Sequence, residues 1–497
     1  MNKKFVRIWA FLMVLCICVC CAACGEQPSN DKGKPQNAIS TPVVDDTSST
    51  ESQGNSSNNS QPVSSNNSSN NSSQPTVSDS DRLYYKPTSV TLSMYDTTAL
   101  SVGFTWNSEF EPIDPVIQIC EGSTFSKSKC KEYKATYKTE MVNMPSATYI
   151  YVCKVSIPLK QNTTYSYRAY DKGAQASSER ATFKTGNLSG NSFKFVHVSD
   201  SQVTGADGDY SGEGTGEYFG KTLEGILAGS PDFMVHTGDF VEYSKYEGYW
   251  KNMLDFNAKS IMKLPIMAIS GNHETTYRSG SNETFKHFNN KIPNQASTTR
   301  GYYYSFDYGN TRFIMLNTNN TVTGGLETEQ YNWLVNQLKN NNKKWTIVSM
   351  HNPMYSVGKY GSNPSNNSIA LALRKQLSKL FADYKVDLVL QGHDHAYSKT
   401  YPITDDGVAD KNQTYETIGS VEYTVNPTGT IYSMHGPAGN QNRSPYSVDS
   451  NLYEIAAKSK TNSWAEISIE DNRLTVEIKY YENNKSVTAH SYGIIKK

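Results

Sequence analysis

The pattern of apolar and polar positions divides the chain into four stretches. A nearly unbroken apolar run covers residues 8–21, and almost no hydrophobic side chains follow over residues 26–82. Short alternating runs such as SVTLSMYD fill residues 83–187. From residue 193 onward, apolar runs alternate with stretches of helical periodicity. The pattern predicts an export signal, a tether, an all-β domain and an α/β domain.

The N-terminal 24 residues have the layout of an export signal. A basic start over residues 3–7 precedes the apolar run, and the segment Cys21-Ala22-Ala23-Cys24-Gly25 resembles the bacterial lipobox, in which the last Cys is lipidated. The departure is Cys21, where Leu is usual. We expect cleavage after residue 23 and a lipid anchor on Cys24, which would place the exported chain on the extracytoplasmic face of the cell membrane. Cleavage with release is the alternative.

Residues 25–82 are rich in Ser and Asn and are too polar to bury a core, so they predict a disordered tether. Such a coil reaches roughly 40 Å on average. Residues 83–187 carry about seven short alternating runs separated by turn residues, which is typical of a fibronectin III-like or immunoglobulin-like β-sandwich.

Cysteine and histidine are unevenly distributed. Cys120, Cys130 and Cys153 are the cysteines that follow the signal segment. We expect a Cys120–Cys130 disulfide across a polar turn. Cys153 lies on the apolar face of an alternating run, so we expect it to be buried. All histidines lie beyond residue 192, so any metal site belongs to the α/β domain of residues 193–497.

In this α/β domain, five buried strands are expected to end in polar residues suited to metal binding. The helices between strands are predicted at 216–228, 246–260, 327–340 and 368–384. Because sites in open α/β sheets form outside the carboxyl ends of the strands, the polar residues should gather at one edge. They are Asp200 with Gln202, Asp239, Asn272 with His273 and Glu274, His351, and His393 with His395.

Carboxylate, amide and imidazole ligands without thiolates favour Fe, Mn, Zn or Mg over a Cys-bound structural zinc. One carboxylate can bridge two cations, and two such cations can activate a bridging water for attack on a phosphoester. His273 follows Asn272 directly and need not be a ligand. We expect it to act as an acid or charge stabiliser, with Glu274 orienting it.

These motifs resemble those of the calcineurin-like metallophosphoesterases. The segments GHDHAYSKTYP (392–402) and HNPMYS (351–356), and the sandwich that precedes them, are similar to the purple acid phosphatase branch. The resemblance implies a catalytic domain of two β-sheets flanked by helices and two metal ions per chain, with Fe, Mn or Zn favoured. It also implies one ion held by Asp200, Asp239 and His395, and a second held by Asp239, Asn272, His351 and His393.

By the same resemblance Asp239 would be the bridge, and His273 would contact the phosphoryl group. The chain departs from the branch at three points. Glu242 stands where purple enzymes carry an iron-binding Tyr, and Tyr243 follows it, so both are kept as possible ligands. Gln202 stands where many other members of the family have His, and we expect it to be a weak ligand. Residues 359–361 replace a pair of substrate-contacting His.

The remaining histidines carry weaker expectations. His197 and His236 lie inside apolar strands and are expected in the core or behind the ligands. His287 and His490 stand in no motif and are expected at the surface. His435 opens a Gly-rich stretch, and its sequence leaves open whether it lines the pocket.

The sequence therefore predicts a surface-tethered phosphoester hydrolase, most simply a phosphomonoesterase acting on a phosphorylated small molecule or polymer. A phosphodiesterase acting on nucleotides, lipid headgroups or wall polymers is the alternative, and a non-catalytic surface binder is a more distant one. Acidic and basic residues number 47 each, which argues against a nucleic-acid-binding surface. The oligomeric state stays open.

Overall fold

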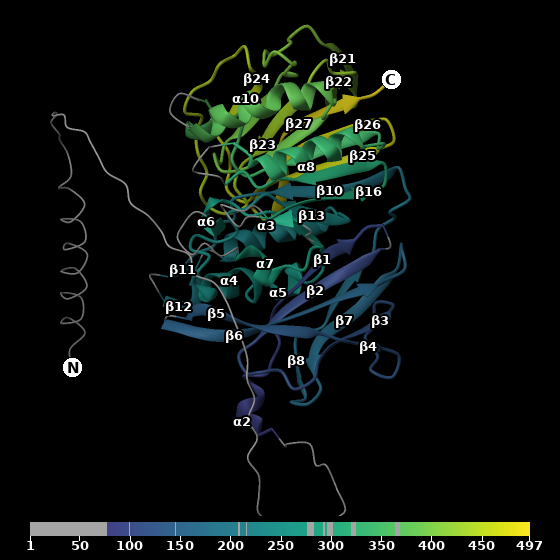
Figure 1. Cartoon of the computed structure of the whole chain (residues 1–497), viewed down its shortest axis with the longest axis vertical. Helices are drawn as coiled ribbons and strands as arrows, with labels where there is room; N and C mark the ends of the chain where they lie inside the picture. Colours follow the sequence, from purple (N-terminus) through teal and green to yellow (C-terminus); the bar gives the residue numbers. More distant parts are fainter. Residues whose placement is uncertain are drawn as a thin grey trace, which may run out of the picture. The chain divides into compact units, whose positions relative to one another are not determined.

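The computed structural model describes residues 77–98, 100–144, 146–206, 209–214, 216–275, 283–291, 294–295, 302–319, 325–362 and 368–497, which belong to one compact unit (Figure 1). The predicted signal, Cys24 and most of the tether lie outside these residues. The end of the predicted tether forms a one-turn helix, α2 (Asp79–Arg82), whose first turn is capped by the hydroxyl of Ser78. Within the described ranges, no helix is both long enough and apolar enough to cross a membrane.

Two antiparallel sheets form the N-terminal sandwich, as the alternating runs predicted. The first has the order β1 (Thr88–Asp96), β2 (Ser101–Ser108), β6 (Ser146–Pro158), β5 (Thr136–Met144). The second has the order β4 (Lys131–Lys134), β3 (Pro115–Glu121), β7 (Thr164–Asp171), β8 (Ala176–Ser177), with β9 (Ala181–Lys184) also paired to β7.

Two eight-stranded mixed sheets follow and confirm the α/β prediction. One has the order β14 (Ile266–Ala268), β13 (Phe233–His236), β10 (Ser192–Val198), β25 (Ser463–Glu470), β26 (Arg473–Glu482), β27 (Lys485–Ile495), β22 (Val421–Val425), β21 (Thr414–Ile418). The other has the order β15 (Asn294–Gln295), β16 (Tyr302–Tyr308), β17 (Thr311–Met315), β18 (Trp345–Ser349), β19 (Leu388–Gln391), β23 (Ile431–His435), β20 (Tyr397–Thr400), β24 (Tyr453–Ala457). A small hairpin joins β11 (Gly205–Ala206) to β12 (Asp209–Gly214).

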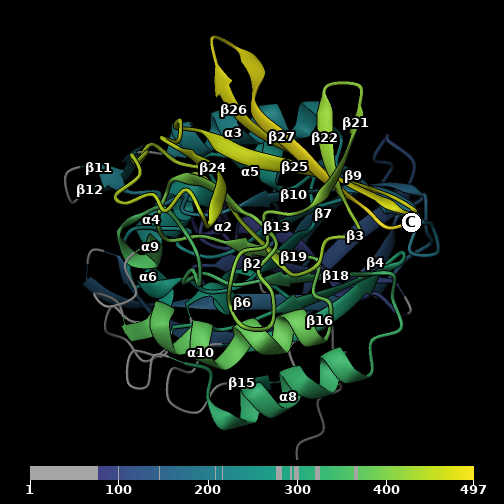
Figure 2. The ribbon, with the colours of Figure 1, turned by 90° about the horizontal axis from the view of Figure 1, so that it is seen from above.

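The two large sheets pack face to face, and helices cover their outer faces (Figure 2). Phe195 of β10 meets Phe313 of β17 edge to face in the shared core. On one side, α8 (Thr328–Lys339) and α10 (Ser368–Asp383) bury apolar residues such as Leu334 and Leu377 against β17–β19. On the other side, α3 (Gly216–Ala228) packs against β25, where Trp464 is fully buried.

The helix predicted over residues 246–260 is two helices, α4 (Glu247–Leu254) and α5 (Ala258–Ile261). Between them Asp255 accepts hydrogen bonds from the backbone N–H and the hydroxyl of Ser89 in the sandwich. The break is therefore set by a contact with a distant strand, which periodicity does not encode. The short helices α6 (Asn272–Thr275), α7 (Thr284–His287) and α9 (Lys359–Ser362) complete the described helices.

Polar side chains join the sandwich to the α/β layers through buried contacts. Lys154 of β6 donates to the carbonyls of Phe285 and Phe288, and Asn107 of β2 donates to the Glu247 carboxylate at 2.8 Å. Hydrophobic residues of both parts also belong to one continuous core cluster. The predicted boundary between residues 187 and 193 falls in the turn from β9 to β10 inside this unit.

His287 is a correction to the sequence-based expectation of a surface residue. Its side chain is 1% exposed, its ring stacks on Trp250 at 4.2 Å, and its Nε2 lies 3.6 Å from Glu247. The sequence did not indicate this burial, because the surface that covers His287 belongs to the sandwich. There the hydroxyl of Thr91 donates a hydrogen bond to the His287 carbonyl.

The sulfurs of Cys120 and Cys130 lie 2.8 Å apart as free thiols, and Cys153 is buried. The two chain segments therefore meet as expected, and the disulfide itself stays a prediction.

We predict that Glu247→Gln will remove a pH dependence of stability. Burial raises the pKa of Glu247 to about 8. Between its unfolded pKa, about 4.3, and its folded value, the folded chain holds a proton that the unfolded chain has released, so stability falls as pH rises through this window. The free energy of unfolding of Glu247→Gln relative to the parent should rise by roughly 1–3 kcal/mol from pH 5 to pH 8.

Denaturant titrations at both pH values measure this difference. Glu217→Gln is the matched control, because that carboxylate is 57% exposed beside Lys221. A flat difference for Glu247→Gln, equal to that of Glu217→Gln, would contradict the prediction.

Candidate metal centre

The ends of five strands bring the predicted ligands together through an unusual backbone. Asp200, Gln202, Asp239, His393 and His395 all have positive φ, between 36° and 75°. Non-glycine residues adopt this left-handed conformation at a cost, and they do so mainly where the surroundings impose it for function.

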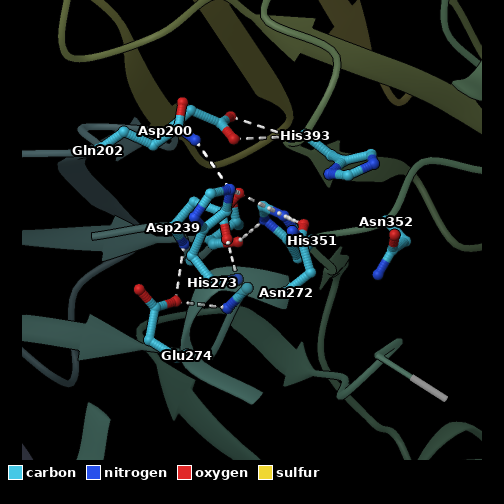
Figure 3. A network of polar contacts seen from close by, with 12 residues as sticks. Asp200, Gln202, Asp239, Asn272, His273, Glu274, His351, Asn352 and His393 are labelled. Carbon is cyan, nitrogen blue, oxygen red and sulfur yellow. Dashed lines mark hydrogen bonds and ion pairs between the residues drawn. The ribbon is translucent and has the colours of Figure 1, made fainter. Parts of the chain in front are cut away.

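Asp239, His351 and His393 form the densest part of the site, with one ligand atom from each lying within 4.8 Å of the others. His351 Nε2 lies 3.1 Å from Asp239 Oδ2 and 2.9 Å from Asn272 Oδ1 (Figure 3). His351 Nδ1 donates to the carbonyl of Thr237 at 2.8 Å, so its Nε2 is left to bind a cation. This donor set fits the second predicted ion.

A second group lies beside the first. His395 Nε2 is 3.3 Å from Asp200 Oδ1, and His395 Nδ1 donates to the carbonyl of Gln441 at 2.7 Å. Gln202 Nε2 contacts His273 Nε2 at 3.0 Å, whereas Gln202 Oε1 is buried without a hydrogen-bond partner among the described residues. A buried amide oxygen of this kind suits a weak metal ligand, so Asp200, His395 and Gln202 fit the first predicted ion.

Glu274 departs from its expected role of orienting His273. Its carboxylate accepts hydrogen bonds from the backbone N–H groups of Asp239, Phe240 and Gly271 at 2.8–2.9 Å. It therefore fixes the loop that carries Asp239 against the loop that carries Asn272 (Figure 3). A carboxylate at N3 of a short helix is well placed to bind free backbone amides, a signal that the sequence contained.

The carbonyl of Glu242 orients His273 in place of Glu274, because it accepts from His273 Nδ1 at 2.7 Å. His273 Nε2 consequently faces Gln202 and lies 3.8 Å from Asp239 Oδ2. The Glu242 carboxylate borders the cavity into which the site opens, and it accepts a hydrogen bond from Gln441 Nε2 at 3.4 Å. Tyr243 differs, since its side chain is 46% exposed and its ring packs near Tyr246 and Tyr249.

Buried carboxylates that stay ionised give the centre its affinity for positive charge. Burial alone would raise the pKa of Asp239, but the positive charge of protonated His351 lowers it to about 2. Asp239 in turn raises the pKa of His351 to about 9 against the effect of burial, and a cation bound at Nε2 would take the place of that proton. The pKa of Asp200 is likewise lowered, because His395 outweighs burial. Burial lowers the pKa of His393 to about 4, which keeps this ring neutral and able to bind a cation.

The site opens into a polar cavity of about 370 Å³. The lining residues that the sequence analysis did not single out as site residues are Asn319, Asn352, Tyr360, Ile369, Gln441 and Arg443. Tyr360 lies in α9, Ile369 lies in α10, and the others lie in loops. The motif of residues 351–356 contains Asn352, and the departure at residues 359–361 contains Tyr360. The Gly-rich stretch of residues 433–442 drew attention to His435, whereas the cavity uses Gln441 and the adjacent Arg443.

Three further histidines lie behind the ligands, as predicted for two of them. His197 Nδ1 meets His435 Nδ1 at 2.7 Å, and His197 Nε2 meets the hydroxyl of Thr237 at 3.0 Å. His236 Nε2 meets the hydroxyl of Ser201 at 3.0 Å. His435 is therefore a buried partner of His197.

Residues 193–397 match the family model of calcineurin-like phosphoesterases, so the chain carries a calcineurin-like metallophosphoesterase domain. Residues 87–185 match the purple acid phosphatase N-terminal domain. The chain thus has the two-part organisation of purple acid phosphatases, as its motifs predicted.

Purple acid phosphatases are also among its relatives. Purple acid phosphatase 15 of Arabidopsis thaliana is 26% identical over 317 residues, covering 57% of this chain and 53% of the relative. Purple acid phosphatase 23 of the same plant is 29% identical over 319 residues, covering 57% and 61%. The chain thus spans little more than half the length of these relatives. The structure of a purple acid phosphatase from yellow lupin (Lupinus luteus) seeds superposes with a TM-score of 0.67 at 20% identity, covering 83% of this chain and 75% of that one.

We predict that the iron-loaded protein will lack a strong visible charge-transfer band. The phenol of Tyr243 is exposed to solvent, and the carboxylate of Glu242 borders the cavity instead. Visible spectra of the iron-loaded parent and of Tyr243→Phe should therefore be alike. An intense band that disappears in Tyr243→Phe would show that this side chain binds the metal.

Proposed function

We propose that this chain is a dinuclear-metal phosphoester hydrolase, with phosphomonoesters as its simplest substrates. The observation that carries the proposal is the cluster of Asp239, His351 and His393, to which the Asp200–His395 pair is joined by the hydrogen bond from the His393 backbone N–H to Asp200. The match to calcineurin-like phosphoesterases supports the same reaction class. Fe, Mn and Zn are the favoured metals, because the donors are carboxylate, amide and imidazole.

Asp200, Asp239, His395 and Gln202 would hold one cation, and Asp239, Asn272, His351 and His393 the other. When bound, the two cations supply Lewis-acid activation of water and of the phosphoryl oxygens. The chain's own residues orient the proposed ligands. The Thr237 carbonyl fixes the imidazole of His351, and the Gln441 carbonyl fixes that of His395. The Glu274 carboxylate fixes the loop of Asp239.

His273 would act on the phosphoester itself. Its Nδ1–H is bound to the Glu242 carbonyl, so Nε2 is the atom that faces the cavity. From there it can donate to a phosphoryl oxygen or pass a proton to the leaving oxygen.

Phosphodiester hydrolysis is the second candidate, and Tyr360 is the observation that favours it. Tyr360 occupies the stretch in which the purple branch carries its substrate-contacting His pair, and its ring lies 4.4 Å from that of His393. Rates with 4-nitrophenyl phosphate and with bis(4-nitrophenyl) phosphate separate the two activities, and absence of both would favour the non-catalytic binder.

We predict that His273→Ala and Asp239→Asn will separate chemistry from metal binding. His273→Ala should lower turnover roughly 10²–10⁴-fold, the usual scale for a positioned acid or base, with metal content unchanged. Asp239→Asn should lose both turnover and bound metal, because its carboxylate would belong to both ions. Metal analysis beside phosphate-release kinetics measures this. Two bound ions and near-normal turnover in Asp239→Asn would contradict the assignment.

We also propose that the chain is exported and anchored by a lipid on Cys24, a proposal that rests on the lipobox resemblance alone. In producing cells, Cys24→Ser should move the protein from the membrane fraction to the soluble fraction. Unchanged recovery with the membranes would contradict the anchor.

A further inference from the structure

Two chain segments that contribute residues to the cavity lining, 356–361 and 436–443, are attached to the Gly-His-Asp-His motif. Asp394 accepts hydrogen bonds from the backbone N–H groups of Tyr360 and Gly361 at 3.0 and 2.8 Å, and from the hydroxyl of Ser356. The loop of residues 356–361 is thereby held beside the ligand His393.

The second loop, residues 436–443, is held by His395, whose Nδ1 donates to the Gln441 carbonyl. Two residues farther on, the backbone of Arg443 is fixed on both sides. Its N–H donates to the hydroxyl of Ser459 at 3.2 Å, and its carbonyl accepts from the Ser459 N–H at 3.1 Å. The position from which the Arg443 side chain extends is therefore set by the fold.

Arg443 stands out among the residues that line the cavity. It is the single Lys or Arg of that lining, and its side chain is exposed. In the part of the chain that the structure describes, no carboxylate forms an ion pair with it, whereas Arg312 and Arg473 are paired with Asp307 and Glu470. A permanently charged guanidinium is thus available at the mouth of a phosphoester site.

We propose that Arg443 binds a second anionic group, a carboxylate or another phosphate, on the leaving part of the substrate. The proposal rests on the proposed hydrolase function and names its substrate class. The cations held by the ligand cluster would neutralise the reacting phosphoryl group, so Arg443 is left for a charge elsewhere on the molecule. The planar guanidinium fork matches carboxylate and phosphate oxygens in a bidentate manner, which a neutral leaving group cannot exploit.

Matched substrates test the proposal on the metal-loaded protein. They are phenyl phosphate, the 3- and 4-isomers of carboxyphenyl phosphate, and benzene-1,4-diyl bisphosphate. The parent should prefer the substrates whose leaving part carries a second anionic group over phenyl phosphate in kcat/KM, chiefly through a lower KM. Arg443→Gln should lower the ratio of kcat/KM for these substrates over that for phenyl phosphate about tenfold or more, the scale of one hydrogen-bonded charge pair. Arg443→Lys should retain part of the preference.

Lys458→Gln is the control, because Lys458 is exposed and lies next to Ser459, which fixes the Arg443 backbone, but does not line the cavity. It removes the same charge and should leave the ratio within about twofold, as expected for an exposed charge outside the cavity. An unchanged ratio in Arg443→Gln would overturn the proposal. So would an equal loss on all substrates, which would place Arg443 on the reacting phosphoryl group. If the parent hydrolyses none of these monoesters, the proposed phosphomonoesterase function is overturned, and the Arg443 assignment with it.

Discussion

The burial of two ionised carboxylates, Asp200 and Asp239, is the constraint on which the rest of the site depends. Removing such charges from water is costly unless they are paired and hydrogen-bonded, and here imidazoles surround both. The left-handed backbone at five ligand positions stores further strain. A further buried carboxylate, that of Glu274, supports this arrangement because it accepts hydrogen bonds from the backbone of the Asp239 loop. A cation between these groups would relieve the charge that the fold has concentrated.

The proposed metal ligands and the proposed substrate contact of Arg443 both depend on one short segment of chain. Within Gly-His-Asp-His, His393 and His395 face the ligand cluster, while Asp394 holds the loop of Tyr360. His395 joins both tasks, because its Nδ1 binds the loop of Gln441 and leaves its Nε2 beside Asp200. The loop that delivers Arg443 is therefore positioned by a ligand, and a change in ligand geometry would reach the rim of the cavity through one hydrogen bond.

The sequence predicted what depends on local pattern and on the order of strand ends. Alternation and helical periodicity predicted the sandwich, the α/β layers and, to within about one residue, the bounds of α3, α8 and α10. The strand ends predicted Asp239, His351 and His393 as neighbours. It did not predict the role of Glu274 or the burial of His287, since both depend on partners that are distant in the chain or are backbone groups. Arg443 was not predicted either, because it lies in a loop without periodicity, whereas the stretch of Tyr360 was noticed only as a departure from the family motif.

The contacts of His287 also bear on what the sandwich does. Thr91 and Lys154 of the sandwich bond backbone carbonyls over residues 285–288, and Asn107 bonds Glu247 at the start of α4. α4 begins six residues after Val241, which follows the Asp239 loop, and Trp250 of α4 donates its indole N–H to the carbonyl of Ser244 in between. The hydroxyl of Ser244 in turn donates to the carbonyl of His273. A continuous series of contacts therefore runs from the sandwich to the residue that would act on the phosphoryl group, which favours a structural role for the sandwich in holding the metal loops over that of a separate binding module.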